Sequence, residues 1–125
     1  MPIPQHDAQA TTIGRYVYVF GGGQVSSYDH VLRYDPARGA VTQVGSLPTP
    51  ASDVAVAALG ATAYVVGGFT GVDPLDTIVA WTPSGPERAA AHLPAGLRYA
   101  ATAVAGGRLV IAGGTVSGGV SDASD

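Results

Sequence analysis

Two adjacent glycines follow a short apolar run at three places in this chain, always 46 residues apart. The pairs are Gly21-Gly22, Gly67-Gly68 and Gly113-Gly114, and the runs before them span 16–20, 62–66 and 108–112. A constant period of this length indicates repeated supersecondary units that bury their apolar faces against one another. The repeat therefore predicts an architecture before any single residue suggests a function.

The remaining positions of the repeat outline a unit of four strands. A first strand ends at a turn glycine, the second ends at the glycine pair, a third covers 30–34 or 77–81, and a weak fourth leads into Leu-Pro at 47–48 and 93–94. Short connections of this kind predict antiparallel pairing. The units are 2–47, 48–93 and an incomplete 94–125. Tyr34 and Trp81 are 47 residues apart, so we predict one extra residue in the 70–75 loop and one fewer in the next turn.

Composition agrees with units that are packed on both faces. Hydrophobic residues make up 46% of the chain and charged residues only 12%, which is about half the usual charged share of about 25%. In the second strand Tyr16, Tyr18 and Phe20 alternate with Val17 and Val19, so both faces are apolar. Such sheets are expected to stack face to face around an axis, as the blades of a β-propeller do.

Several classes of function have no support in the residues. The net charge is −3 and the few basic residues do not cluster along the sequence, so we expect no nucleic-acid partner and no membrane insertion. The chain lacks cysteine, and His6, His30 and His92 occupy different phases of the repeat. We therefore expect no metal, and without a phosphate-binding glycine motif we expect no cofactor. No signal peptide or membrane-spanning run is visible, so we expect a soluble chain in an unknown compartment.

The glycine pairs, Tyr34-Asp35-Pro36 and the Leu-Pro boundary together resemble the Kelch repeat, and Trp81-Thr82-Pro83 matches its third strand loosely. The resemblance covers nearly the whole chain. It implies an all-β fold of Kelch-type β-propeller blades. Kelch blades usually carry a tryptophan early in the fourth strand, where this chain has Val41 and, roughly, Glu87. We expect that departure to weaken the packing between neighbouring blades.

The ring is expected to be incomplete within this chain. A propeller usually has about 4–8 blades, whereas the sequence holds two whole units and half of a third. Each end of the stack would expose an apolar face, and 108–112 would be an edge strand. We expect a homo-oligomer or the remainder of a larger propeller to complete the ring. The isolated chain is not expected to be a stable monomer.

Candidate binding residues lie in the connections between units. The connections at 4–7, 50–53 and 95–99 and the loops at 23–29, 70–75 and 115–121 are expected on one face. Equivalent positions of the connections are His6, Ser52 and Arg98, followed by Asp7, Asp53 and Tyr99. Stacking around an axis would bring these six side chains together at the mouth of a channel. In the bland interpretation, Asp7 and Asp53 cap turns or accept backbone hydrogen bonds.

The leading hypothesis is a non-catalytic module that binds a protein or peptide or serves as a structural segment. The Kelch resemblance implies that Arg98 would contact an acidic peptide. One alternative is a fragment of a sugar-processing propeller enzyme, for which no catalytic residue can be named. Another is an engineered or evolutionary-model fragment that self-assembles. We expect Trp81 and the tyrosines to belong to the core and not to a ligand platform.

Overall fold

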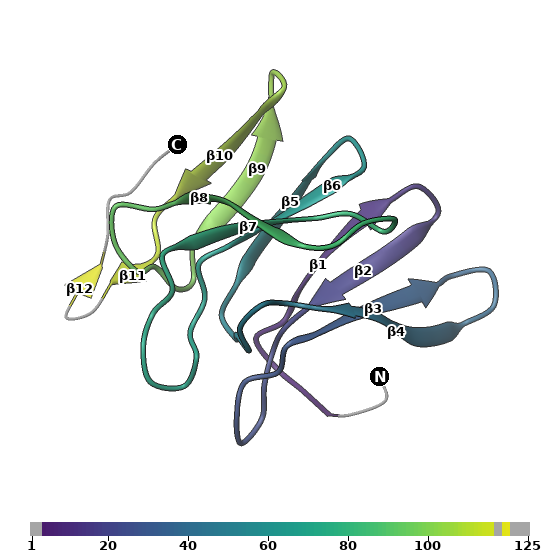
Figure 1. Ribbon diagram of the computed structural model, residues 1–125, viewed down its shortest axis with the longest axis horizontal. Coiled ribbons are helices and arrows are strands. Elements are labelled where there is room, and N and C mark those ends of the chain that lie inside the picture. Colours follow the sequence, from purple (N-terminus) through teal and green to yellow (C-terminus); the bar gives the residue numbers. More distant parts are fainter. Residues whose placement is uncertain (1–3, 117–118, 121–125) are drawn as a thin grey trace.

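The computed structural model describes residues 4–116 and the backbone of residues 119–120, and every element in this part is a β-strand (Figure 1). The strands are β1 (Gln9–Ile13), β2 (Tyr16–Phe20), β3 (His30–Asp35), β4 (Ala40–Ser46), β5 (Ala55–Leu59), β6 (Thr62–Val66), β7 (Thr77–Trp81), β8 (Arg88–His92), β9 (Ala101–Ala105), β10 (Arg108–Ala112), β11 (Thr115–Val116) and β12 (Gly119–Val120). The described residues hold no helix that is long and apolar enough to cross a membrane.

Consecutive hairpins build the sheets. Sheet 1 contains β1 to β4 and sheet 2 contains β5 to β8, each in chain order and antiparallel throughout. Sheet 3 pairs β9 with β10. The all-β prediction is confirmed, and the four-stranded antiparallel sheets are consistent with propeller-like blades. The described sheets do not form a closed ring, and the expected third strand of the last unit, from residue 121, lies outside the described residues.

The loops follow the repeat with the predicted compensation. Residues 21–29 separate β2 from β3, whereas 67–76 separate β6 from β7, so the second loop is one residue longer. His30 pairs with Ser46 but Thr77 pairs with His92, so the following turn is one residue shorter. The expectation of a plain loop at 115–121 needs correction, because β11 and β12 form a small hairpin there. Residues 117, 118 and 121 of that range lie outside the described part.

The three sheets lie side by side, and their first strands, β1, β5 and β9, are neighbours (Figure 1). A line of backbone hydrogen bonds joins the connections that precede these strands. The Asp53 N–H donates to the Asp7 carbonyl (N···O 2.9 Å), and the Tyr99 N–H donates to the Asp53 carbonyl (3.1 Å). The same residue of each repeat therefore binds its counterpart in the next.

A cluster of aromatic rings fills the space between sheets 1 and 2. Tyr18 and Phe20 of β2 contact Trp81 of β7, with ring centroids 5.0 and 5.4 Å apart. All three side chains are buried, which confirms that Trp81 and Tyr18 belong to the core. An indole from the third strand thus occupies this interface although the fourth strands carry no tryptophan. Gly45 of β4 makes room for it, because a Cβ there would lie 3.0 Å from Trp81 Nε1.

The first two glycine pairs each receive the connection of the next repeat. A Cβ on Gly21 would overlap the carbonyl oxygen of Ala51, and the Gly22 N–H donates to that oxygen (2.9 Å). The second pair makes the same contacts with Leu97. A Cβ on Gly67 would overlap the Leu97 carbonyl oxygen, and the Gly68 N–H donates to that oxygen (2.8 Å). The first glycine also has a φ of +63° or +61°, a conformation that is costly for other residues. The 46-residue period is therefore the spacing of the positions at which one repeat packs on the next.

Candidate functional site

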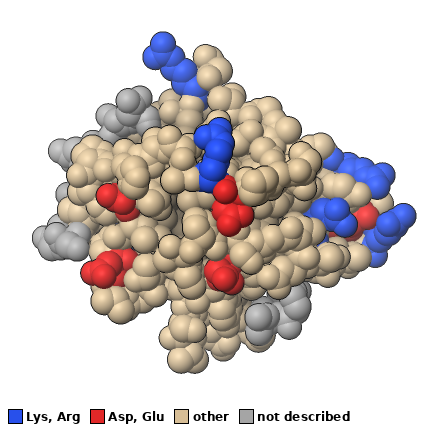
Figure 2. Space-filling model, viewed as in Figure 1, with Lys and Arg blue, Asp and Glu red and all other residues tan. Residues whose placement is uncertain are grey.

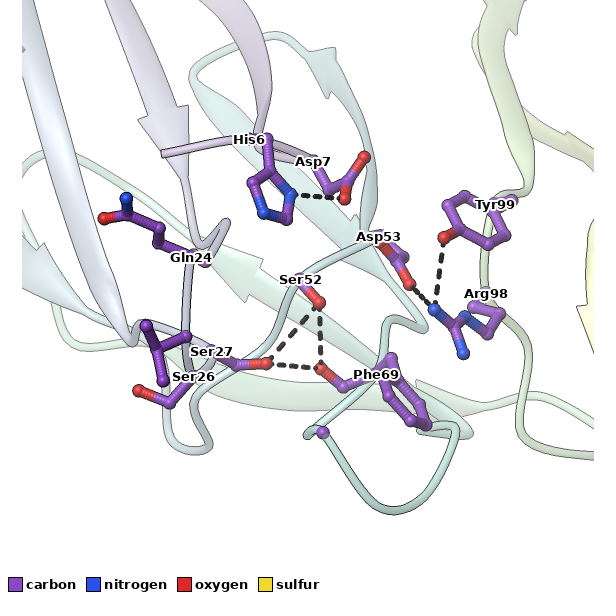
Figure 3. Close-up of a pocket in the computed structure, with 13 residues that line it drawn as sticks. His6, Asp7, Gln24, Ser26, Ser27, Ser52, Asp53, Phe69, Arg98 and Tyr99 are labelled. Carbon is purple, nitrogen blue, oxygen red and sulfur yellow. Dashed lines mark hydrogen bonds and ion pairs between the residues drawn. The ribbon is translucent and has the colours of Figure 1, made fainter. Parts of the chain in front are cut away.

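A pocket of about 410 Å³ lies where the three connections meet. All six residues named from the repeat phases, His6, Asp7, Ser52, Asp53, Arg98 and Tyr99, line it. Figure 3 shows their side chains arriving from segments that precede β1, β5 and β9. The sequence located two of the rim loops but named no residue in them. The lining residues in these loops are Gly23, Gln24, Val25, Ser26, Ser27 and Gly71, and Phe69, just before the expected 70–75 loop, was missed.

An unusual backbone conformation marks the start of each inner strand. Asp7, Asp53 and Tyr99 have φ of 58°, 57° and 60°, and they are the only non-glycine residues with positive φ in the described part of the chain. Aspartate tolerates this region, whereas a tyrosine there is uncommon. The recurrence at one repeat position shows that the turn itself is structural. Among the described hydrogen bonds, no backbone N–H donates to the Asp7 or Asp53 carboxylate.

Arg98 and Asp53 form an ion pair that joins sheets 2 and 3 at the pocket wall (Figure 3). The Asp53 side chain is only 2% exposed and that of Arg98 is 26% exposed. The Arg98 guanidinium also lies 3.8 Å from the centroid of the Phe69 ring, and its Nη2 donates to the Tyr99 hydroxyl (3.1 Å). Burial alone would lower the pKa of Arg98, but the hydrogen bonds to Asp53 and Tyr99 and the Asp53 charge outweigh it and raise the pKa. Arg98 therefore stays charged and bound to Asp53 and Tyr99.

The ion pair with Asp53 makes Arg98 less available to bind a ligand carboxylate. An incoming carboxylate would have to compete with a buried carboxylate that already holds the guanidinium. The exposed charged groups of the pocket are instead His6 and Asp7, whose Nδ1 and Oδ2 atoms are 2.6 Å apart and whose side chains are 63% and 42% exposed. Counted with neutral histidine, the residues Asp7, Asp53 and Arg98 give this pocket a formal charge of −1.

Hydroxyl groups line the side of the pocket between sheets 1 and 2 (Figure 3). The Ser27 Oγ donates to the Phe69 carbonyl (3.0 Å) and lies 3.4 Å from the Ser52 Oγ. The Ser52 N–H and the Phe69 N–H each donate to the other residue's carbonyl, so the loop after β6 is fixed against the connection before β5. The serines thus hold their loops together and present polar atoms to the cavity.

The other two histidines lie elsewhere. His30 is buried and its Nε2 is 2.6 Å from the Gln5 Oε1, while His92 is paired with Asp76 at 3.3 Å. Burial lowers the pKa of His30, against smaller opposing effects of the Gly21 backbone and the Asp29 charge. Within the described residues no three His, Asp or Glu side chains are grouped as metal ligands.

Charge is sparse over the face drawn in Figure 2, where acidic and basic side chains occur singly or in small groups. The structure does bring two arginines together that are distant in the sequence. The guanidinium groups of Arg15 and Arg33 lie 5.0 and 4.5 Å from the centroid of the Tyr16 ring. This is a local cation–π group on sheet 1, not a basic stripe.

Comparison with known proteins supports the fold and nothing finer. No family model matches the chain, and no curated protein sequence matches it. Among solved structures, the one described as "Structure of YjhT" superposes with a TM-score of 0.85 over 97% of this chain, at 19% sequence identity. This chain spans 47% of the YjhT chain. In all, 124 solved chains are similar, and so widely shared a fold does not specify a function.

Proposed function

We propose that this chain is a segment of a Kelch-type β-propeller and that it binds a protein or peptide at the mouth pocket. The observation that carries the proposal is the convergence of three connections, 46 residues apart, on one cavity of about 410 Å³. Adjacent four-stranded antiparallel sheets and the glycine pairs support the propeller. The Tyr34-Asp35-Pro36 motif supports the Kelch type.

The rim of the pocket has the composition of a peptide-binding surface. The Tyr99 side chain is 56% exposed, and Val25, at the tip of the loop after β2, is fully exposed. Aromatic side chains commonly provide the anchoring contacts of such interfaces, with polar groups around them. Here the polar groups are the serine hydroxyls, Gln24 and the His6–Asp7 pair.

The accessible charge of the pocket indicates the charge of the peptide that it would bind. Because Asp53 neutralises Arg98, the Asp7 carboxylate is the accessible charge of the pocket. We therefore propose a basic or neutral segment in place of the acidic one that the Kelch resemblance implies. A lysine or arginine side chain could reach Asp7 without displacing a buried partner, whereas a glutamate could not reach Arg98 at the same low cost.

The test compares three fluorescent peptides that are identical except for lysine, glutamine or glutamate at their variable positions. We expect the lysine peptide to bind the full chain most tightly in an anisotropy titration. Asp7→Asn, which keeps a residue that tolerates positive φ, should weaken that binding about fivefold. Asp76→Asn is the matched control, because Asp76 also pairs with a histidine but does not line the pocket.

Two results would contradict the proposal. One is that none of the three peptides binds. The other is that Asp7→Asn and Asp76→Asn change the affinity for the lysine peptide equally. Preferential binding of the glutamate peptide would restore Arg98 as the recognition residue and overturn the charge assignment.

A further inference from the structure

Three of the six arginines of the chain gather at the end of sheet 1 that lies opposite the mouth pocket. Arg15 is in the turn between β1 and β2, Arg33 is on β3, and Arg38 is in the turn after β3. Figure 2 shows basic side chains around an acidic one at the end of the molecule where, in Figure 1, the two hairpins of sheet 1 lie. The strands β1 and β2 separate this group from the mouth pocket by about 17 Å, the length of five extended residues.

Two of these arginines lie against one aromatic ring. The guanidinium carbons of Arg15 and Arg33 are 5.0 and 4.5 Å from the centroid of the Tyr16 ring, and the Arg15 Nη2 donates to the Tyr16 hydroxyl (2.8 Å). The two carbons are therefore at most about 10 Å apart, within the Debye length of an ordinary buffer. Because the hydroxyl oxygen accepts from Arg15, its own O–H can still donate to a ligand.

The neighbouring carboxylate does not neutralise these two arginines. The Asp35 Oδ1 accepts a backbone N–H of its own turn (3.0 Å), and its Oδ2 is 4.0 Å from the Arg38 Nε. Within the described residues, no carboxylate lies within 4.0 Å of Arg15 or Arg33. Of the effects that raise the pKa of Arg15, the hydrogen bond to Tyr16 is the largest and the Asp35 charge is the smallest. The three arginines and Asp35 give a formal charge of +2, in a chain whose net charge is −3.

The arginine group borders the interface between sheets 1 and 2. Tyr16 packs against the core cluster that contains Tyr18 and Trp81. Arg33 pairs with Tyr18 across β3 and β2, and directly paired residues share one face of a sheet. Both sheets beside this face are described, so the placement of Tyr16 and Arg33 does not depend on what covers the outer face of sheet 1.

The fold of the repeat does not require these side chains. The second repeat has small uncharged residues at the same positions, namely Ala61 for Arg15, Thr62 for Tyr16 and Ala80 for Arg33. Its strands β6 and β7 nevertheless pair in the register of β2 and β3. The charged group is therefore an addition to the common scaffold, which favours a role in binding over a role in folding.

We propose that Arg15, Tyr16 and Arg33 form a binding site for a phosphate dianion, either free or carried as a monoester. A phosphate group offers three acceptor oxygens and about two negative charges near pH 7, which matches the local charge. Each guanidinium presents a planar fork of N–H donors, and the Tyr16 O–H adds another donor. A carboxylate, with two oxygens and one charge, would satisfy fewer of these groups. The site is separate from the proposed peptide site at the mouth pocket.

The first test is an NMR titration of the nitrogen-15-labelled full chain with inorganic phosphate at constant ionic strength. The Nε–H signals of Arg15 and Arg33 should shift together and saturate with one dissociation constant. Arg15→Ala and Arg33→Ala, which introduce the residue of the second repeat, should each weaken binding about tenfold. Arg88→Ala is the matched control, because Arg88 is an exposed arginine on β8 of sheet 2, and it should leave the affinity unchanged.

The second test distinguishes a free phosphate from a phosphorylated side chain. Three fluorescent peptides that differ only in phosphoserine, serine or glutamate at one position are titrated with the full chain in anisotropy measurements. Preferential binding of the phosphoserine peptide, displaced by inorganic phosphate, identifies a phosphorylated segment as the ligand. Binding of inorganic phosphate without that preference identifies a free phosphate compound.

Three results would each overturn the phosphate site. They are a phosphate titration without saturation, an equal shift at Arg88, and equal losses of affinity in Arg33→Ala and Arg88→Ala. Circular dichroism checks the fold of the variants, and Arg15→Ala, at an exposed turn position, keeps the test valid if Arg33→Ala is destabilised. A chain that binds phosphate but not the lysine peptide would overturn only the function proposed for the mouth pocket.

Discussion

At the scale of single residues, the pocket depends on which side chains pair with one another. The repeat phase located His6, Ser52 and Arg98, and then Asp7, Asp53 and Tyr99, without any structure. It could not show that Asp53 holds Arg98 or that Phe69 underlies the guanidinium. Those contacts depend on the positive φ of Asp53 and Tyr99. Aspartate hints at such a turn, but a tyrosine gives no such signal.

Removing the arginine of this pair should be costly. Arg98→Ala leaves the Asp53 carboxylate, 2% exposed, without its partner. We expect the free energy of unfolding to fall by about 2–3 kcal/mol, which is below the about 3–5 kcal/mol of a fully buried pair because Arg98 is partly exposed. Urea denaturation at a fixed protein concentration measures it. Arg38→Ala is the control, since its 77% exposed side chain is 4.0 Å from Asp35, and it should cost less than about 0.5 kcal/mol. Equal losses would show that the Arg98 pair is not structural.

At the scale of strands and sheets, the alternating apolar pattern predicted most of the boundaries. The second strands span 16–20, 62–66 and 108–112 as expected, and β7 covers 77–81. The fourth strands were only weakly indicated, and β8 shows why, because every residue in it is exposed. Its pairing with β7 depends on backbone hydrogen bonds, which leave no hydrophobic pattern in the sequence.

The sequence predicted that Trp81 is a core residue of a third strand, but not that it packs between sheets 1 and 2. The Kelch repeat, which the sequence resembles, usually has a tryptophan early in the fourth strand, where this chain has Val41 and, roughly, Glu87. In the structure Trp81 reaches the interface from the end of β7 and packs beside Gly45 of β4. A residue of the third strand can fill this interface because sheets 1 and 2 share one core. The sequence pattern of a single repeat does not show which residues of the next repeat it will contact.

Trp81 is therefore expected to be the main side chain holding sheets 1 and 2 together. Trp81→Ala should lower the free energy of unfolding by about 3–5 kcal/mol, because the cavity opens against Tyr18 and Phe20. Far-UV circular dichroism in urea is the appropriate probe, since the variant removes the only tryptophan. Val72→Ala, at an 80% exposed loop position, should change stability by less than about 0.5 kcal/mol. A Trp81→Ala loss as small as that of Val72→Ala would place the indole outside the core.

At the scale of the whole molecule, the account explains why the glycine pairs recur. The first two pairs are the points at which the next connection docks, so the 46-residue step is the separation along the chain between equivalent docking points. The sequence predicted stacking from the two apolar faces of each sheet. It did not reveal that a carbonyl oxygen from the following connection excludes every side chain from the first glycine, because that contact joins residues 30 positions apart, as in Gly21 and Ala51.

The most direct test of this central claim compares Gly67→Ala with Gly60→Ala. Both residues have positive φ, +61° and +63°, but only at Gly67 would the added methyl group overlap a backbone carbonyl, that of Leu97. At one protein concentration in urea, Gly60→Ala should lower the free energy of unfolding by about 1 kcal/mol through backbone strain alone. Gly67→Ala should lower it by about 2–3 kcal/mol more. Equal losses for the two variants would contradict the docking of each connection on the preceding glycine pair.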